Sequence, residues 1–273
     1  MGERLVMENR NVGMAALADR PLVGRVTGLR LPDHLPRPAM NDVKALIFDV
    51  FGTLVDWRTS IARESAALLS PLGIPIDWLA FADAWRDQYQ PAMEAVRSGR
   101  LPFCKLDRLH RHNLDVVLAD FGLDAVNEST RQSLNLAWHR LDAWPDVAPG
   151  LHRLRRHYRL APCSNGNISL MVDLARRNDF PWDAILGAEV ARDYKPKPAV
   201  YLAAADAFDL TPAETLMVAA HSSDLDAAAR AGLRTAFIAR PDEFAQGAGE
   251  RMPTVPVDLT AVSLTDLADQ LTP

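Results

Sequence analysis

The 273-residue chain has few cysteines, little net charge and no long apolar run, and each shortage excludes a class of protein. Its two cysteines, Cys104 and Cys163, form no CxxC pair, which excludes a disulfide framework and favours a reducing cytoplasm as the compartment. A formal net charge of −5 gives no reason to expect nucleic acid or an anionic membrane as a partner. No apolar run approaches the roughly 20 residues that a membrane helix needs.

Residues 1–39 differ from the rest of the chain. They lack a sustained helical or strand period, and prolines and glycines are scattered through them. Their acidic residues argue against a transit peptide, and they contain no apolar core of the kind found in a secretory signal. We therefore expect a disordered N-terminal extension or an upstream start codon, with the folded protein beginning near Met40.

Beyond this extension, the apolar pattern changes from a strand to a block of helices. Residues 43–50 (VKALIFDV) form a short apolar, branched run that leads to an acid, which predicts a strand buried on both faces of a parallel sheet. From 57 to 140 apolar residues recur at helical spacing, and no strand is expected. Four helices are expected there, over residues 61–72, 78–96, 106–117 and 134–141.

After Trp144 strand and helix patterns alternate. Strands are expected over 159–164, 184–188, 215–220, 234–239 and 257–262, and helices over 168–177, 200–208, 225–231 and 264–271. This alternation predicts an α/β fold, with a parallel sheet covered by helices on both faces. The helical block would then be inserted at the carboxyl end of the first strand, where ligands bind in open α/β sheets, and would cap a site there. We divide the chain into the extension 1–39, a core of 40–56 and 141–273, and a helical cap of 57–140.

Four expected strand ends carry polar residues that could take part in chemistry. They are Asp49 to Leu54 (DVFGTL), Ser164-Asn165-Gly166, Tyr194-Lys195-Pro196 followed by Tyr201, and His221 to Asp224 (HSSD). An acid at the end of a buried strand, followed by a glycine turn and a hydroxyl, is a candidate nucleophile. Taken singly, each of the four also fits a plain structural role, as a turn, a helix N-cap or a solvated surface lysine.

In this order and combination, the four segments resemble the haloacid dehalogenase superfamily. The resemblance covers residues 43–271, and it implies a Rossmann-like core with an inserted cap. Phosphatases of that superfamily carry a second aspartate two residues after the first, which protonates the leaving alkoxide, but this chain has Phe51 there. They also have an acid four residues before the last aspartate, where this chain has Ala220. Since Mg²⁺ prefers several hard oxygen ligands, we expect no metal and no other cofactor.

The motif around Phe51 is similar to that of the L-2-haloacid dehalogenases (haloacid dehalogenase type II). In that subfamily a cap arginine follows a tryptophan on a long helix, as Trp85-Arg86 does here. Tyr89 and Met93 are expected one and two turns further along the same helical face. The resemblance implies a hydrolase that converts short L-2-haloalkanoic acids to D-2-hydroxyalkanoic acids through an aspartyl ester.

The resemblance also implies a role for each matching residue. Asp49 would be the nucleophile, oriented by Thr53. Positive charge from Lys195 would offset the repulsion between the nucleophile and the substrate carboxylate. Ser164 and the main chain of Val50 and Phe51 would bind the substrate carboxylate, and Arg86 and Asn165 would bind the halide. Tyr201 would support Lys195, and Asp224 would place or activate the water molecule.

The last motif departs from that of some characterised members. A serine, an asparagine and a tryptophan used by those members are replaced by Ala219, His221 and Ser223. His221 is therefore a candidate for substrate binding, with a structural hydrogen-bonding role as the alternative. Other members of the dehalogenase-like group resemble this chain in having Ala-Ala-His where it has residues 219–221, so the change is typical of a subgroup.

Three other functions stay open at the level of the sequence. A related hydrolase could open a strained ring such as azetidine-2-carboxylate with the same nucleophile. A phosphatase is disfavoured by Phe51 and Ala220, and a non-catalytic binding protein would have no need of a nucleophile. The expected partner is a small 2-haloalkanoate rather than nucleic acid or a membrane. Family members are often homodimers, although the sequence contains no interface signature.

Overall fold

The computed structural model of the protein describes residues 40–272, so the expected extension at 1–39 lies outside the described residues. Among those described, no helix is both long enough and apolar enough to cross a membrane.

A six-stranded sheet forms the centre of the fold. Its strand order is β5-β4-β1-β6-β7-β8, and every neighbouring pair is parallel. The strands are β1 (Ala45–Phe48), β4 (Arg159–Ser164), β5 (Leu186–Gly187), β6 (Thr215–Ala219), β7 (Arg234–Ile238) and β8 (Leu259–Ala261). The predicted parallel α/β sheet is confirmed. Strand β1 lies between β4 and β6, and all four of its side chains are buried, as expected for a central strand of a parallel sheet.

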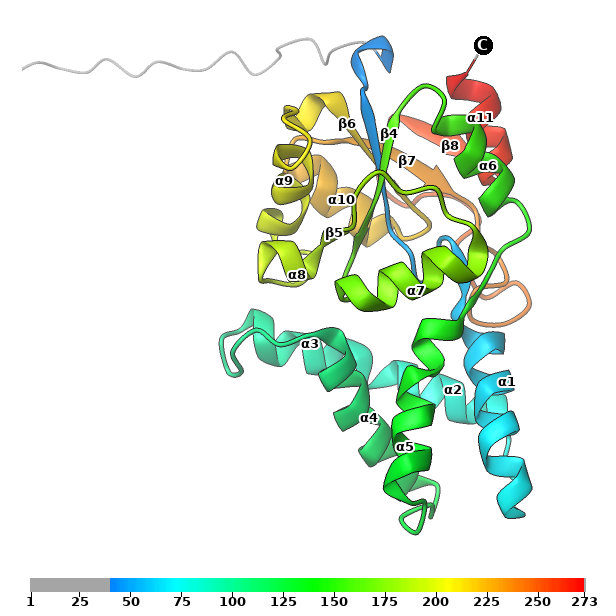
Figure 1. Ribbon diagram of the computed structural model, residues 1–273. Coiled ribbons are helices and arrows are strands. Elements are labelled where there is room, and N and C mark those ends of the chain that lie inside the picture. The colour runs from blue at the N-terminus through cyan, green and yellow to red at the C-terminus, as the bar shows by residue number, and fades with distance from the viewer. Residues whose placement is uncertain (1–39, 273) are drawn as a thin grey trace, which may run out of the picture. The chain divides into compact units, whose positions relative to one another are not determined.

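Helices cover both faces of this sheet (Figure 1). Leu46 and Phe48 of β1 belong to one apolar cluster, and Ile47 belongs to another, since successive side chains of a strand point to opposite faces. The first cluster includes side chains of α6 (Val147–Leu154), α7 (Ile168–Asn178) and α11 (Leu264–Leu271). The second includes side chains of α9 (Pro198–Asp206) and α10 (Ser222–Arg230).

The segment between β1 and β4 is helical, and we call residues 57–140 the helical insertion. Its elements are α1 (Trp57–Leu69), η2 (Ser70–Leu72), α2 (Trp78–Asp87), α3 (Tyr89–Arg97), α4 (Leu106–Asp120), α5 (Glu128–Asn135) and η3 (Leu136–Arg140). A two-stranded antiparallel ladder of β2 (Val55–Asp56) and β3 (Asp142–Ala143) brings the start and the end of the insertion together.

Three helix predictions need correction. The single helix expected over 78–96 is two helices, α2 and α3, that meet at Gln88. Pro91 explains the break, because a proline inside a continuous helix would lack the N–H that bonds four residues back. The pattern from 134 to 141 ends as the 3-10 helix η3. Helix α6 was not expected at all, and it contains both Pro149 and Gly150.

Tertiary packing accounts for α6. A methyl group placed on Gly150 would lie 2.8 Å from both the backbone and the side chain of Leu264, so α6 and α11 are in close contact at this glycine. The remaining short elements are η1 (Met40–Asp42), α8 (Ala188–Ala191) and η4 (Pro212–Glu214).

Candidate active site

The topology of the sheet gathers the polar strand ends at one edge. Strands β4, β1 and β6 are neighbours and run in parallel, so their carboxyl ends meet. Asp49 follows β1, Ser164 ends β4, and His221 lies just past β6. Because parallel strands end at a common edge, residues more than 100 positions apart in sequence become neighbours here.

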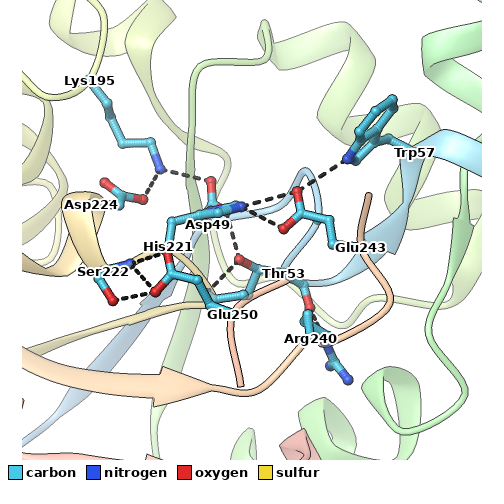
Figure 2. Close-up of polar contacts among 12 residues, drawn as sticks. Asp49, Thr53, Trp57, Lys195, His221, Ser222, Asp224, Arg240, Glu243 and Glu250 are labelled. Carbon is cyan, nitrogen blue, oxygen red and sulfur yellow. Dashed lines mark hydrogen bonds and ion pairs between the residues drawn. The ribbon is translucent and has the colours of Figure 1, made fainter. Parts of the chain in front are cut away.

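Lys195 lies between two of the predicted carboxylates (Figure 2). Its ammonium Nζ donates to Asp49 Oδ1 at 2.8 Å and to Asp224 Oδ2 at 2.5 Å. The Tyr201 hydroxyl donates to the other oxygen of Asp224, Oδ1, at 2.5 Å. Tyr201 therefore acts on Lys195 through Asp224 instead of touching it. All four side chains are predicted site residues, and they form one hydrogen-bonded chain.

The second oxygen of Asp49 has different partners. Asp49 Oδ2 accepts from Thr53 Oγ1 at 2.7 Å and lies 3.1 Å from His221 Nδ1. Thr53 is itself oriented, because its hydroxyl oxygen accepts the Ala220 N–H at 2.9 Å. Burial alone would raise the pKa of Asp49, but Lys195 and His221 outweigh it and hold that pKa far below its ordinary range. Asp49 is thus an ionised, buried carboxylate with both oxygens hydrogen-bonded.

His221 joins Asp49 to a carboxylate that sequence analysis missed. Its Nε2 lies 2.9 Å from Glu243 Oε2, and the Glu243 side chain is only 1% exposed. Trp57 Nε1 donates to the same carboxylate at 3.2 Å. Burial opposes the charged imidazolium, but the bonds to Asp49 and Glu243 prevail and raise the pKa of His221 to about 10. His221 is therefore protonated at neutral pH.

Gly52 makes room for Glu243. A methyl group on Gly52 would lie 2.0 Å from Glu243 Oε1, and Gly52 has a φ of +85°, which few other residues adopt. Glu243 follows β7 in an Arg-Pro-Asp-Glu stretch at the same edge of the sheet. That position was the only signal available in the sequence, and it does not distinguish a buried carboxylate from an exposed loop acid.

A cavity of about 610 Å³ opens above Asp49. Core residues and residues of the helical insertion line it together, among them Asp49, Phe51, Arg86, Asn165, Lys195 and His221. Arg97 of α3 also lines it, and Arg97 Nη1 donates to the backbone carbonyl of Lys195 at 2.9 Å. The insertion thus covers the carboxyl edge of the sheet, as the sequence predicted.

Arg86 enters this cavity within a cage of aromatic rings. Its guanidinium carbon lies 4.1 Å from the ring centre of Tyr89, 5.3 Å from that of Trp57 and 6.0 Å from that of Phe51. Such contacts favour a cation. Its Nη1 is buried without a hydrogen-bond partner among the described residues. A buried N–H donor without an acceptor is costly, and an anion bound in the cavity would supply one.

Not every predicted site residue reaches the cavity. Neither Ser164 nor Val50 lines it, and both are almost fully buried. The Ser164 hydroxyl accepts the Gly166 N–H at 3.1 Å, so it shapes the loop after β4. Asn165 does line the cavity, and its Oδ1 accepts the backbone N–H of Lys195 at 2.8 Å. The Asn165 side chain also hydrogen-bonds to the Tyr89 hydroxyl, and the Tyr89 ring lies beside Arg86.

The carboxylates of the site are not arranged for a metal ion. Within residues 40–272 no group of three or more His, Cys, Asp or Glu side chains could hold one. Phe51 and Ala220, where phosphatases have acids, are buried at 2% and 1% exposure. The Lys195 ammonium lies between Asp49 and Asp224, at 2.8 Å from one carboxylate and 2.5 Å from the other.

The chain is similar to known proteins over most of its length. The family model for haloacid dehalogenase-like hydrolases matches residues 43–232. The solved structure of a defluorinating L-2-haloacid dehalogenase is 45% identical, with a TM-score of 0.82 over 84% of this chain and 95% of that one. Another L-2-haloacid dehalogenase structure is 46% identical, with a TM-score of 0.81 over 84% of this chain and 98% of that one. (S)-2-haloacid dehalogenase 1 of Pseudomonas sp. (strain CBS-3) is 28% identical over 75% of this chain and 89% of its own.

The ion pairs of His221 predict a pH-dependent contribution to stability. Its pKa is about 10 in the folded protein, against 6.5 ordinarily. A group whose pKa is raised on folding stabilises the folded protein fully at a pH below its pKa in the unfolded chain. This stabilisation is lost as the pH rises through its pKa in the folded protein. The free energy of unfolding of wild type should exceed that of His221→Gln near pH 6, and the gap should shrink towards pH 10. Urea unfolding across this range measures it, and a gap that stays constant would contradict the ion pairing.

Proposed function

The chain belongs to the haloacid dehalogenase-like hydrolases, and from this premise we propose that it hydrolyses short L-2-haloalkanoic acids to D-2-hydroxyalkanoic acids. The observation that carries the proposal is the pairing of two groups across one cavity. An ionised carboxylate, Asp49, lies at its base, and the caged Arg86 has a buried donor without a partner. A nucleophile facing an anion site suits a displacement that releases halide.

In the first step of the proposed reaction, an Asp49 oxygen attacks C2 of the substrate from behind the carbon–halogen bond. The electron pair of that bond leaves with the halide towards Arg86 and Asn165, and C2 is inverted. A halide is a weak base and leaves without a proton, so an apolar Phe51 is compatible with the step. The first product is an ester between Asp49 and the hydroxy acid.

In the second step, water attacks the carbonyl carbon of the Asp49 ester. The bond between that carbon and the Asp49 oxygen attached to C2 breaks, which releases the D-2-hydroxy acid with this oxygen as its hydroxyl and restores the carboxylate with an oxygen from water. Asp224 would take the proton of the attacking water and pass it to the departing alkoxide. Asp224 stays close through its bonds to Lys195 and Tyr201.

Substrate binding brings a second carboxylate close to Asp49, which is unfavourable unless positive charge compensates. Lys195 supplies that charge at 2.8 Å from Asp49. Phe51 lines the same cavity, and its main chain completes the proposed carboxylate site, whereas Val50 does not line the cavity. Ser164 would contribute by holding the loop that carries Asn165, since its hydroxyl accepts from Gly166.

The covalent step predicts where the oxygen of water goes. In a single turnover in H₂¹⁸O with enzyme in excess over 2-chloropropionate, the label should enter the Asp49 side chain, because water attacks the ester carbonyl. The hydroxy acid should carry ordinary oxygen, and Asp49→Asn should release no halide. Mass spectrometry of the Asp49 peptide and of the product measures both. Label in the first product, with none in the peptide, would contradict the ester.

Arg86→Lys tests the proposed halide site. The substitution keeps the charge but loses the planar donor set, so halide release should slow by roughly 100-fold. Rapid-quench chloride measurement follows this step. Arg58→Lys is the matched control, because Arg58 also belongs to the helical insertion but pairs with Asp83 and does not line the cavity. Equal rates in the two variants would remove Arg86 from the reaction.

Metal removal should leave the reaction unchanged. Lys195 already pairs with both Asp49 and Asp224, and the side chains of Phe51 and Ala220 carry no oxygen with which to bind a metal ion. Chloride release from 2-chloropropionate is therefore expected to be the same in excess EDTA as with added Mg²⁺. Loss of activity in EDTA, or efficient hydrolysis of phosphate monoesters with Mg²⁺, would instead indicate a phosphatase.

A further inference from the structure

We infer that His221, kept protonated by Glu243, is a catalytic residue that forms with Thr53 an oxyanion hole for the Asp49 ester. The inference rests on the proposed function and deepens it. Glu243 is a positioning residue, since it touches His221 and not the reacting atoms. In this arrangement the two oxygens of Asp49 have separate tasks.

The partners of each Asp49 oxygen determine those tasks. Asp49 Oδ1 accepts only from Lys195 among the described residues, and this donor is shared with Asp224. Asp49 Oδ2 faces two donors, Thr53 Oγ1 at 2.7 Å and His221 Nδ1 at 3.1 Å. Oδ1 therefore keeps more freedom to attack, and Oδ2 becomes the carbonyl oxygen of the ester.

The second step then develops charge where the two donors already lie. As the water oxygen bonds to the ester carbon, the π electron pair moves onto Oδ2, while Asp224 takes the water proton. Collapse returns that pair to the carbon–oxygen double bond and breaks the bond to Oδ1, which leaves as alkoxide and takes the proton from Asp224. The acid formed at Asp49 then loses its proton to solvent. Donors fixed in advance at such an oxyanion are among the largest sources of rate enhancement.

The contacts of His221 make it a donor in this step and not a base. Both ring nitrogens face carboxylates, Nδ1 towards Asp49 and Nε2 towards Glu243. An imidazole with an acceptor at each nitrogen is best satisfied when both nitrogens carry a proton. It then has no lone pair with which to accept a proton from water.

Glu243 matters most once the ester has formed. Alkylation removes the negative charge of Asp49 and with it one of the two anions that keep His221 protonated. Glu243 stays, fixed by the Trp57 N–H and enclosed at 1% exposure. In the ester, two carboxylates, Asp224 and Glu243, remain to pair with two cations, Lys195 and His221.

The charged surroundings of His221 come from several elements. Asp49 and Glu243 contact its ring directly. The other charged side chains that line the same cavity are Arg86, Asp87, Arg97, Lys195, Asp224 and Glu250. Of these, Glu250 lies near the start of α10, where it accepts the backbone N–H of Ser222 at 3.1 Å.

Rapid-quench kinetics with (S)-2-chloropropionate in excess over the enzyme separates the two half-reactions. In His221→Gln, chloride should still appear in a burst of about one equivalent per site, because Asp49 keeps Lys195 and loses a competing cation. Ester hydrolysis should slow by roughly 100-fold, the size expected for loss of one oxyanion donor. The Asp49 ester should then accumulate, and peptide mass spectrometry would detect it.

The pH profile of ester hydrolysis distinguishes a donor from a base. If His221 donates to the oxyanion, hydrolysis falls as pH rises through the pKa of His221. Glu243→Gln removes an anion that holds the proton, so the fall should move to lower pH. A hydrolysis rate that instead rises through this titration, or a fall that stays in place in Glu243→Gln, would overturn the inference.

His139→Gln is the matched control. His139 is also buried between two carboxylates, Asp173 at 2.8 Å and Asp107 at 3.1 Å, but it lies outside the cavity. This variant should show a wild-type burst and wild-type ester hydrolysis. If wild type itself releases no chloride, the proposed function fails and this inference with it. If wild type turns over and His221→Gln hydrolyses the ester normally, this inference alone fails.

Discussion

The contact between the Lys195 ammonium and two buried carboxylates is the interaction on which the site depends. Without the Lys195 ammonium between them, the Asp49 and Asp224 carboxylates would repel each other. Removing one member of a buried ion cluster leaves an uncompensated charge and is strongly destabilising. The same contact keeps Asp49 ionised, so the stability of this edge of the sheet and the reactivity of the nucleophile have a common origin.

Sequence reasoning predicted the fold correctly where the hydrophobic pattern of a segment alone determines its structure. The buried run that became β1 and the alternation after residue 144 both follow from periodicity, and the meeting of the motifs at one edge follows from the parallel sheet. It failed where local signals conflict with packing. Helix α6 forms despite Pro149 and Gly150 because it packs against α11, and the break at Gln88 follows from Pro91, a signal that the apolar spacing obscured.

Some residues of the candidate site could likewise be predicted from the sequence, and others could not. Asp49, Lys195 and Asp224 could be predicted, because each stands at a strand end within a recognisable motif. Glu243 could not, because its burial depends on contacts with residues far away in sequence, the Trp57 indole and the Gly52 backbone. Only Tyr89 in the aromatic cage of Arg86 could be predicted from the spacing, because Trp57 joins the cage from α1 and Phe51 from the turn after β1. Partners set by three-dimensional proximity leave no pattern in one sequence.

The close approach of Gly52 and Glu243 also ties the conformation of a turn to the position of a distant carboxylate. The φ of +85° at residue 52 favours glycine whatever stands opposite. With Glu243 in this conformation, a single methyl group at 52 would overlap its carboxylate. A side chain at 52 would therefore displace that carboxylate from the Trp57 indole and the His221 ring, so a substitution in the turn after β1 would act at a residue almost 200 positions away.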